Sequence, residues 1–295
     1  IRGEEIDVRV STMPTVYGES VSLRLLIRGG GLITMSDLGL NDHDNQILTR
    51  MINRPHGILL VTGPTGSGKS TSLYAWLHTI NSMDKRIMSA EDPIEYEMKG
   101  INQVQMRPEI GLDFSSTLRT FLRQDPDVIM VGEIRDKETA EISIRAALTG
   151  HLVFSTIHTN DSASTITRLL DMDIEPFLVS SSVEGIVAQR LIRTLCTKCR
   201  KPAQYQQDFL KMHGFPIDKL NDSKIIYEAV GCDECRDTGY RGRSGIFEIL
   251  PINDEIRPLI VSNASASSIK QAALDQGMKT LRDDGWEKVL DLSLI

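Results

Sequence analysis

Residues 63–70 of this chain read Gly63-Pro64-Thr65-Gly66-Ser67-Gly68-Lys69-Ser70. This stretch matches the phosphate-binding pattern G-x-x-x-x-G-K-[ST] at every fixed position. Residues 57–62, GILLVT, form a short apolar run rich in branched side chains, which predicts a buried strand. Over residues 71–80, apolar side chains recur at roughly helical spacing. The motif therefore lies between a strand and a helix, the context that supports a nucleotide-binding loop.

The glycines of this loop let the backbone turn tightly, so that successive N–H groups and the following helix N-terminus face an anion. Lys69 would reach the β- and γ-phosphates of a nucleotide, and the Ser70 hydroxyl would bind Mg²⁺. The alternative, an ordinary glycine-rich turn, is disfavoured by the flanking strand and helix. The predicted nucleotide-binding set is Gly63, Pro64, Thr65, Gly66, Ser67, Gly68, Lys69, Ser70 and Thr71.

The overall composition excludes several classes of protein. With 40% hydrophobic and 25% charged residues among 295, the chain is typical of soluble globular proteins and long enough for more than one unit. No apolar run approaches the roughly 18–20 residues of a membrane span, and no signal peptide opens the sequence. We therefore expect a cytoplasmic protein. The formal net charge of −7 argues against a dedicated nucleic-acid binder.

Weaker patterns flank the nucleotide motif. Alternating residues predict strands over 6–11 and 19–28, followed by a glycine joint at 29–31, and a helix is predicted over 44–53. Because two strands are marginal alone, we expect a truncated domain whose remainder precedes residue 1. Beyond the cysteine region, a strand ends near residue 250 and helices are predicted over about 254–262, 267–276 and 280–290.

Carboxylates follow two further apolar runs. Residues 85–90 lead into Glu91-Asp92-Pro93-Ile94-Glu95, and residues 128–131 lead into Gly132-Glu133. Because nucleotide chemistry takes place at the carboxyl ends of parallel strands, we expect these acids near the phosphate loop. Gly132 stands where a metal-supporting Asp is usual, so Glu133 would polarise water or organise Mg²⁺. The alternative for the first segment is an acidic, solvated loop.

A histidine and two arginines extend this set. The strand predicted over 151–157 ends at His158, which is either a hydrogen-bonded structural residue or a group that contacts the γ-phosphate. A helical pattern over 115–123 places Arg119 and Arg123 at i and i+4, on one face.

All four cysteines occur in two C-x-x-C pairs, Cys196 with Cys199 and Cys232 with Cys235. This pattern predicts a tetrahedral Cys₄ zinc site, and a cytoplasmic location argues against structural disulfides. Free or redox-active thiols are the alternative. Basic residues surround the pairs and leave a nucleic-acid-binding module open, but sparse aromatics favour a solvated face, a subunit contact or a dock for acidic partners.

Four segments in this order resemble the Walker A, Asp box, Walker B and His box of the type II/type IV secretion ATPases. They are residues 63–70, residues 91–95, Gly132-Glu133-Ile134-Arg135-Asp136, and residues 150–160 with His151 and His158. The resemblance covers nearly the whole chain. It implies an α/β protein: a RecA-like P-loop ATPase core with a tetracysteine zinc subdomain and C-terminal helices, preceded by a remnant of a smaller α+β domain.

The resemblance also implies a division of the chain. Residues 1–30 would be the end of a truncated N-terminal α+β domain plus a linker, and residues 31–190 the RecA-like ATPase core. Residues 191–245 would be the tetracysteine zinc subdomain, and residues 246–295 a C-terminal strand and helical region.

Roles for individual residues follow from the resemblance. Residues that match Glu95 and Glu133 are the main catalytic carboxylates of such ATPases. Arginines of the preceding domain that match Arg9 and Arg24 approach nucleotide held by an adjacent subunit, where a guanidinium can neutralise the γ-phosphoryl charge. A surface or interface salt bridge is the alternative for each arginine. The predicted catalytic set is Glu133, Glu95, Lys69, His158, Arg119, Arg123 and Arg135.

The resemblance implies a Mg²⁺-dependent ATPase, the cytoplasmic motor of a bacterial type II secretion system that drives pseudopilus assembly and protein export. The tetracysteine element favours secretion or pilus extension over retraction, so a type IV pilus extension ATPase is one alternative. A nucleotide-gated zinc adaptor with little turnover is another. The implied cofactors are ATP, Mg²⁺ and Zn²⁺. The implied partners are further copies in a hexamer and inner-membrane platform proteins at the cytoplasmic face, with peripheral membrane association and no nucleic acid.

Overall fold

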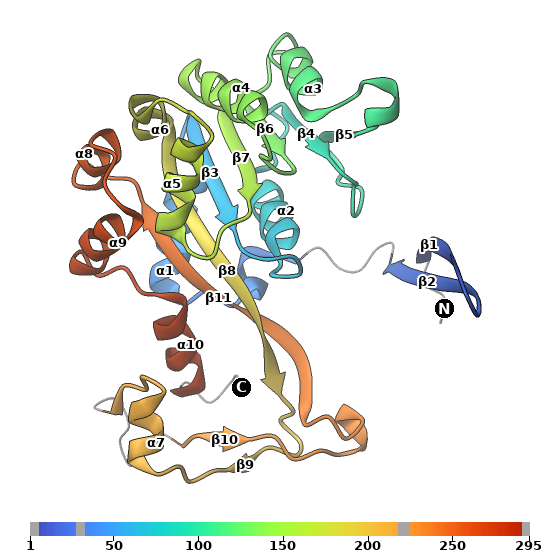
Figure 1. Ribbon diagram of the computed structural model, residues 1–295, viewed down its shortest axis with the longest axis vertical. Coiled ribbons are helices and arrows are strands. Elements are labelled where there is room, and N and C mark those ends of the chain that lie inside the picture. The colour runs from blue at the N-terminus through green and yellow to red at the C-terminus, as the bar shows by residue number, and fades with distance from the viewer. Residues whose placement is uncertain (1–5, 28–32, 218–224, 291–295) are drawn as a thin grey trace.

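A computed structural model describes residues 6–27, 33–217 and 225–290 (Figure 1). The glycine joint predicted at 29–31 lies outside the described residues. At the N-terminal end, β1 (Ile6–Thr15) and β2 (Gly18–Ile27) form an antiparallel hairpin, as the alternation predicts. Arg9 and Arg24 are partners in its register, but their side chains lie outside what the structure describes.

A seven-stranded sheet forms the centre of the molecule, in the order β11-β8-β3-β7-β6-β4-β5 (Figure 1). Its strands are β3 (Gly57–Thr62), β4 (Ile87–Glu91), β5 (Ile101–Gln105), β6 (Val128–Val131), β7 (Leu152–Ile157), β8 (Val183–Leu195) and β11 (Tyr240–Pro251). Neighbouring strands are parallel, except that β11 pairs antiparallel with β8. The predicted α/β class is therefore confirmed.

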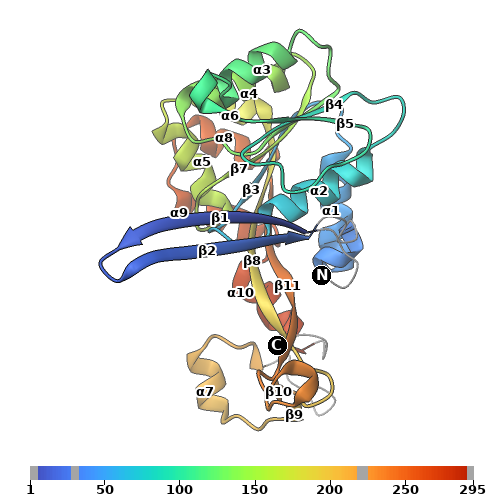
Figure 2. The same ribbon diagram turned by 90° about the vertical axis from the view of Figure 1, so that its right-hand side faces the viewer.

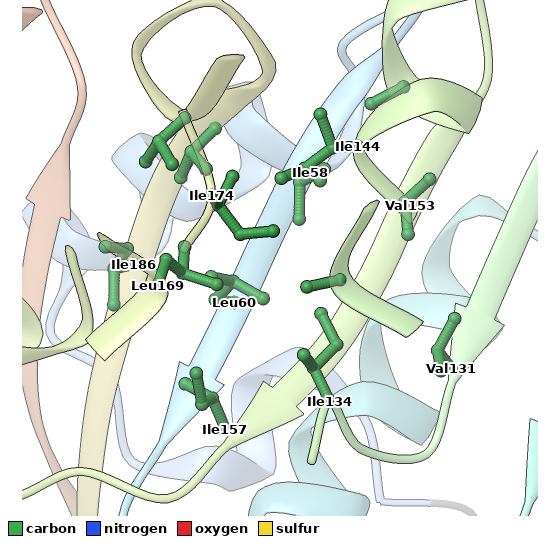
Figure 3. Close-up of a cluster of buried hydrophobic side chains, with 14 of the residues drawn as sticks. Ile58, Leu60, Val131, Ile134, Ile144, Val153, Ile157, Leu169, Ile174 and Ile186 are labelled. Carbon is green, nitrogen blue, oxygen red and sulfur yellow. The ribbon is translucent and has the colours of Figure 1, made fainter. Parts of the chain in front are cut away.

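Helices cover both faces of the sheet because successive side chains of each buried strand point to opposite faces. Ile58 and Leu60 belong to one apolar cluster, shown in Figure 3, while Leu59 and Val61 belong to another. The first cluster is completed by α3 (Phe114–Phe121), α4 (Lys137–Leu148), α5 (Ser162–Asp171), α6 (Pro176–Ser182), α8 (Ile256–Val261) and α9 (Ala266–Asp275). The second cluster is completed by α1 (Asp42–Ile52), α2 (Lys69–Ile80) and the 3₁₀ turn Met35–Leu38.

The long strands β8 and β11 continue past the sheet and carry the cysteine region at their far end (Figures 1 and 2). This region contains β9 (Lys201–Pro202), α7 (Gln207–Met212), β10 (Tyr227–Glu228) and the 3₁₀ turn Asp233–Cys235. The boundaries expected at residues 190 and 245 fall inside β8 and β11. Both strands therefore belong to the sheet and also to the arm, by which we mean their extension together with the cysteine region.

The last described helix, α10 (Leu281–Leu290), fixes the arm to the body. Leu290 packs with Leu210 and Phe215 of the cysteine region in a third apolar cluster. Asp284 accepts a hydrogen bond from the Phe247 N–H at 2.8 Å, and Lys288 pairs with Asp284 at 2.7 Å. Because this ion pair is buried, its partners need each other to offset the cost of leaving water. In the described part of the chain, no helix combines the length and apolarity needed to cross a bilayer.

We predict that Leu60→Ala lowers the free energy of unfolding by about 2–5 kcal/mol, because Leu60 is fully buried and the smaller side chain leaves a cavity. The matched control Leu148→Ala, at a site 46% exposed, should change it by about 0.5 kcal/mol at most. Denaturant unfolding of both variants measures the difference. Equal losses of unfolding free energy in the two variants would contradict a core built on the two faces of the sheet.

Candidate nucleotide-binding site

The phosphate loop leaves the carboxyl end of β3 and enters α2 at Lys69. Gly63, Gly66 and Gly68 have positive φ angles of 150°, 79° and 91°, which glycine adopts at least cost. A Cβ atom on Gly68 would also lie 2.8 Å from Nε2 of Gln189 on β8, whereas a Cβ on Gly66 would meet open space. Backbone conformation and a close neighbouring strand therefore explain the glycines that the motif requires.

The polar groups of this loop fit a phosphate. The Lys69 ammonium donates to the carbonyls of Gly63 at 2.9 Å and Pro64 at 3.1 Å, which holds it over the loop. Burial lowers the pKa of Lys69, and the nearby Glu133 carboxylate partly offsets this change. The buried Ser67 hydroxyl has no hydrogen-bond partner among the described residues. Loop N–H groups, a fixed cation and a free hydroxyl together suit an anionic ligand.

A cavity of about 660 Å³ opens beside the loop, a size within the range of small-ligand sites. It brings together the phosphate loop, the acidic segment after β4, the end of β6 and the end of β7. Its lining includes Thr65, Gly66, Lys69, Ser70, Thr71, Glu91, Glu95, Gly132, Glu133, Arg135 and His158. The carboxyl ends of these parallel strands thus meet at one edge, as the sequence predicts.

Glu133 lies just after β6 with its side chain 15% exposed, between the side chains of Arg135 and His158. Its carboxylate forms an ion pair with Arg135, and its other oxygen lies 3.4 Å from Nε2 of His158. The preceding Gly132 donates its N–H to the Ala90 carbonyl at 2.7 Å, and a Cβ there would lie 3.2 Å from that oxygen. The tight approach of β4 explains why glycine, rather than Asp, precedes the carboxylate.

Two of the predicted arginines lie away from the cavity. Arg119 pairs with Glu138 at 2.8 Å, and both side chains are more than half exposed, so this pair contributes little to stability. Helix α3 ends at Phe121, so the helix predicted through residue 123 is wrong at its end, and the exposed Arg123 follows it. Neither arginine is among the residues that line the cavity of this chain.

The sequence did not single out several residues that also line the cavity, among them Tyr74, Tyr96 and Phe114. Tyr74 falls at an apolar position of the helical pattern after Lys69, so periodicity alone places it in the core. The sequence signal that could have identified Tyr74 is a hydroxyl-bearing side chain at a buried position of the helix that follows a phosphate loop.

The four cysteines converge at the far end of the arm, with all four sulfur atoms within 4.8 Å of one another. The Sγ atoms of Cys196 and Cys232 lie 3.8 Å apart, as do those of Cys199 and Cys235. Disulfide sulfurs would lie about 2.05 Å apart. A tetrahedron with sulfurs about 2.3 Å from a central zinc has an edge of about 3.8 Å. The donor set and its spacing therefore fit zinc.

Backbone donors differentiate these thiols. Burial raises the pKa of the Cys235 thiol. The N–H groups of Gly239 and Cys232, each 3.2 Å from the sulfur, outweigh this effect and lower the pKa to about 7. Burial and the neighbouring thiols instead raise the pKa of Cys199 to about 11. Because thiolates are the metal ligands, the lowered pKa favours metal binding by Cys235 at neutral pH.

The fold and this cavity define a P-loop protein of the α/β class. A family model described as "Type II/IV secretion system protein" matches residues 1–294, so the chain belongs to that family, as its four motifs predict. The type IV pilus assembly ATPase PilB of Myxococcus xanthus (strain DK1622) is 51% identical over 290 residues, covering 98% of this chain and 51% of that protein.

A second relative and a solved structure also match most of this chain. The type II secretion system ATPase E of Vibrio cholerae serotype O1 (strain ATCC 39315 / El Tor Inaba N16961) is 48% identical over 289 residues, covering 98% of this chain and 57% of that protein. The chain thus spans about half the length of the curated relatives it matches. The crystal structure of the pilus retraction motor PilT with bound ADP is 30% identical, with a TM-score of 0.63, covering 94% of this chain and 72% of that one.

We predict different pH profiles for two thiols in protein treated with a chelator. Labelling of Cys235 by iodoacetamide should rise through pH 7 and then level off, because its thiolate fraction follows a pKa of about 7. Labelling of Cys199 should keep rising beyond pH 9, since its pKa is about 11. Mass spectrometry of the labelled peptides gives both profiles, and a shared midpoint would contradict the assigned difference.

Proposed function

We propose that this chain is the ATP-hydrolysing part of the cytoplasmic motor of a bacterial type II secretion system, which drives pseudopilus assembly and protein export. The observation that carries the proposal is the cavity in which the phosphate loop meets Glu133 and Glu95. The similarity to the secretion ATPase of Vibrio cholerae supports the assignment to a type II secretion system. A type IV pilus extension ATPase is the second candidate, favoured by the 51% identity to PilB.

In the proposed reaction, Lys69 and the loop N–H groups bind the β- and γ-phosphates of ATP. Ser70 would hold Mg²⁺, which neutralises charge on the phosphate oxygens. Glu133 orients and polarises the attacking water, and Glu95 adds a second carboxylate to the lining of the cavity. The incoming γ-phosphate competes for Arg135 and His158, both of which contact Glu133, so its binding frees the Glu133 carboxylate for water.

The proposed assembly is a homo-hexamer at the cytoplasmic face of the inner membrane, attached through platform proteins and without nucleic acid. Arg9, Arg24, Arg119 and Arg123 would act across subunit contacts in that ring, because Arg119 and Arg123 lie outside the cavity of their own chain. Sedimentation with and without nucleotide tests the ring, and a duplex-DNA titration at stated salt tests the nucleic-acid alternative.

Residues 31–190 would form the ATPase core of each subunit, and residues 191–245 its zinc subdomain. Residues 1–30 and 246–295 would contribute the end of the N-terminal domain and the C-terminal helices. In this proposal, Zn²⁺ bound by Cys196, Cys199, Cys232 and Cys235 stabilises the end of the arm, whose described residues contribute to a small apolar cluster.

We predict that Lys69→Ala abolishes nucleotide binding and hydrolysis in the full-length protein, because it removes the loop cation. Glu133→Gln should retain nucleotide binding but lower kcat roughly a hundredfold, since an amide polarises water poorly. The control Glu109→Gln changes an exposed carboxylate and should leave both parameters unchanged. Steady-state ATP hydrolysis and nucleotide titration measure them. If the wild-type ring binds ATP but does not hydrolyse it, the alternative of a nucleotide-gated zinc adaptor would be favoured.

We predict about one zinc per chain in the purified protein and a clear loss of zinc in Cys232→Ser, because a closed tetrahedral site needs all four thiolates. The control Thr197→Ser alters an exposed side chain within the first C-x-x-C pair and should retain the metal. Plasma mass spectrometry gives the metal content. Metal-free wild type with oxidised thiols would favour the redox alternative.

A further inference from the structure

A single hydroxyl joins the helix of the phosphate loop to the segment that carries Glu95. Tyr74 lies five residues after Lys69 on α2 and is 1% exposed. Its hydroxyl donates to the Glu91 carboxylate at the end of β4 and accepts the Glu95 backbone N–H at 3.0 Å. Since a backbone N–H can only donate, the single phenolic proton goes to Glu91. Burial and the Glu91 charge raise the pKa of Tyr74, which keeps that proton in place.

Glu91 lines the cavity, but its carboxylate is occupied by contacts within the protein. It is 4% exposed. One oxygen accepts from the Ser89 hydroxyl at 2.5 Å and from Gln103 Nε2 at 3.0 Å, while the other accepts from Tyr74. A buried carboxylate with three donors is held in one place by them. This geometry suits Glu91 to fixing its neighbours rather than to meeting water.

The same carboxylate is tied to the far end of the acidic segment. Gln103 on β5 accepts the Met98 N–H at 2.6 Å and donates to the Tyr96 carbonyl at 3.2 Å. The segment from residue 92 to 98 is therefore bound at Glu95 through Tyr74 and at residues 96 and 98 through Gln103. Both attachments converge on Glu91.

We propose that Glu91 and Tyr74 are positioning residues for Glu95: together they fix the acidic segment to the helix of the phosphate loop, which sets where the Glu95 carboxylate meets the nucleotide. This inference rests on the proposed ATP hydrolysis. It assigns different tasks to the two glutamates of one motif, because Glu91 is held by hydrogen bonds within the protein while Glu95 faces the cavity. A displacement of about 1 Å in such a group costs up to about a hundredfold in rate.

The test is Tyr74→Phe in the full-length protein, alone and combined with Glu95→Gln. Tyr74→Phe should lower kcat roughly tenfold or more while the Kd for ATP changes less than about twofold, since the phosphate loop is untouched. In the Glu95→Gln background the same change should lower kcat by less than about twofold, because the group it positions is already gone. Tyr205→Phe, in the cysteine region, is the matched control and should retain full activity.

Glu91→Gln offers a second route if Tyr74→Phe does not fold. Its amide group replaces one acceptor oxygen, so it should lower kcat with the same dependence on Glu95. Full activity in Tyr74→Phe would overturn the inference, as would a loss of kcat that is equal in both backgrounds or matched by a loss of ATP binding. A wild type without ATP turnover would overturn the proposed function and this inference with it, whereas an active wild type keeps the two failures distinct.

Discussion

The parallel alignment of β3, β7, β6 and β4 is the constraint on which the site depends. Parallel strands end at the same edge, so residues separated by tens of positions in the sequence meet in one cavity. The cost is that these strands must be buried on both faces, and their apolar residues are indeed shared between two clusters. The polar cavity is thus positioned by an apolar sheet.

Strand β8 links this cavity to the cysteine region. Its Gln189 accepts a hydrogen bond from the Ser72 hydroxyl on α2 at 2.7 Å, and Arg190 donates to the Asn160 carbonyl at 2.9 Å. A few residues further along, the same strand leaves the sheet for the arm. Between Gln189 and Leu195, where β8 runs from this contact toward the cysteine region, its described strand partner is β11.

The parts of the site that the sequence predicts are those encoded within a few residues. The phosphate loop, the apolar runs before Glu91 and Glu133, and the paired cysteines each carry a local pattern. Tyr74 was missed because its partners lie 17 and 21 positions away and its spacing is that of an ordinary core residue. The sequence did not predict strand β8, because its half-buried end alternates little and carries arginines, and its extended form there goes with its pairing to β11.

The C-terminal part of the chain, which carries no motif, holds the start of α5 in place through polar contacts. Glu248 on β11 is 1% exposed, yet it accepts from both the N–H and the hydroxyl of Ser162, at 2.9 and 2.6 Å, at the start of α5. Lys270 on α9 lies 3.4 Å from Glu248 and 3.1 Å from Asp161, which caps the same helix. A buried carboxylate without such partners would be costly. The start of α5, which follows His158 in the sequence, is therefore tied to β11 and α9 by buried and half-buried polar contacts.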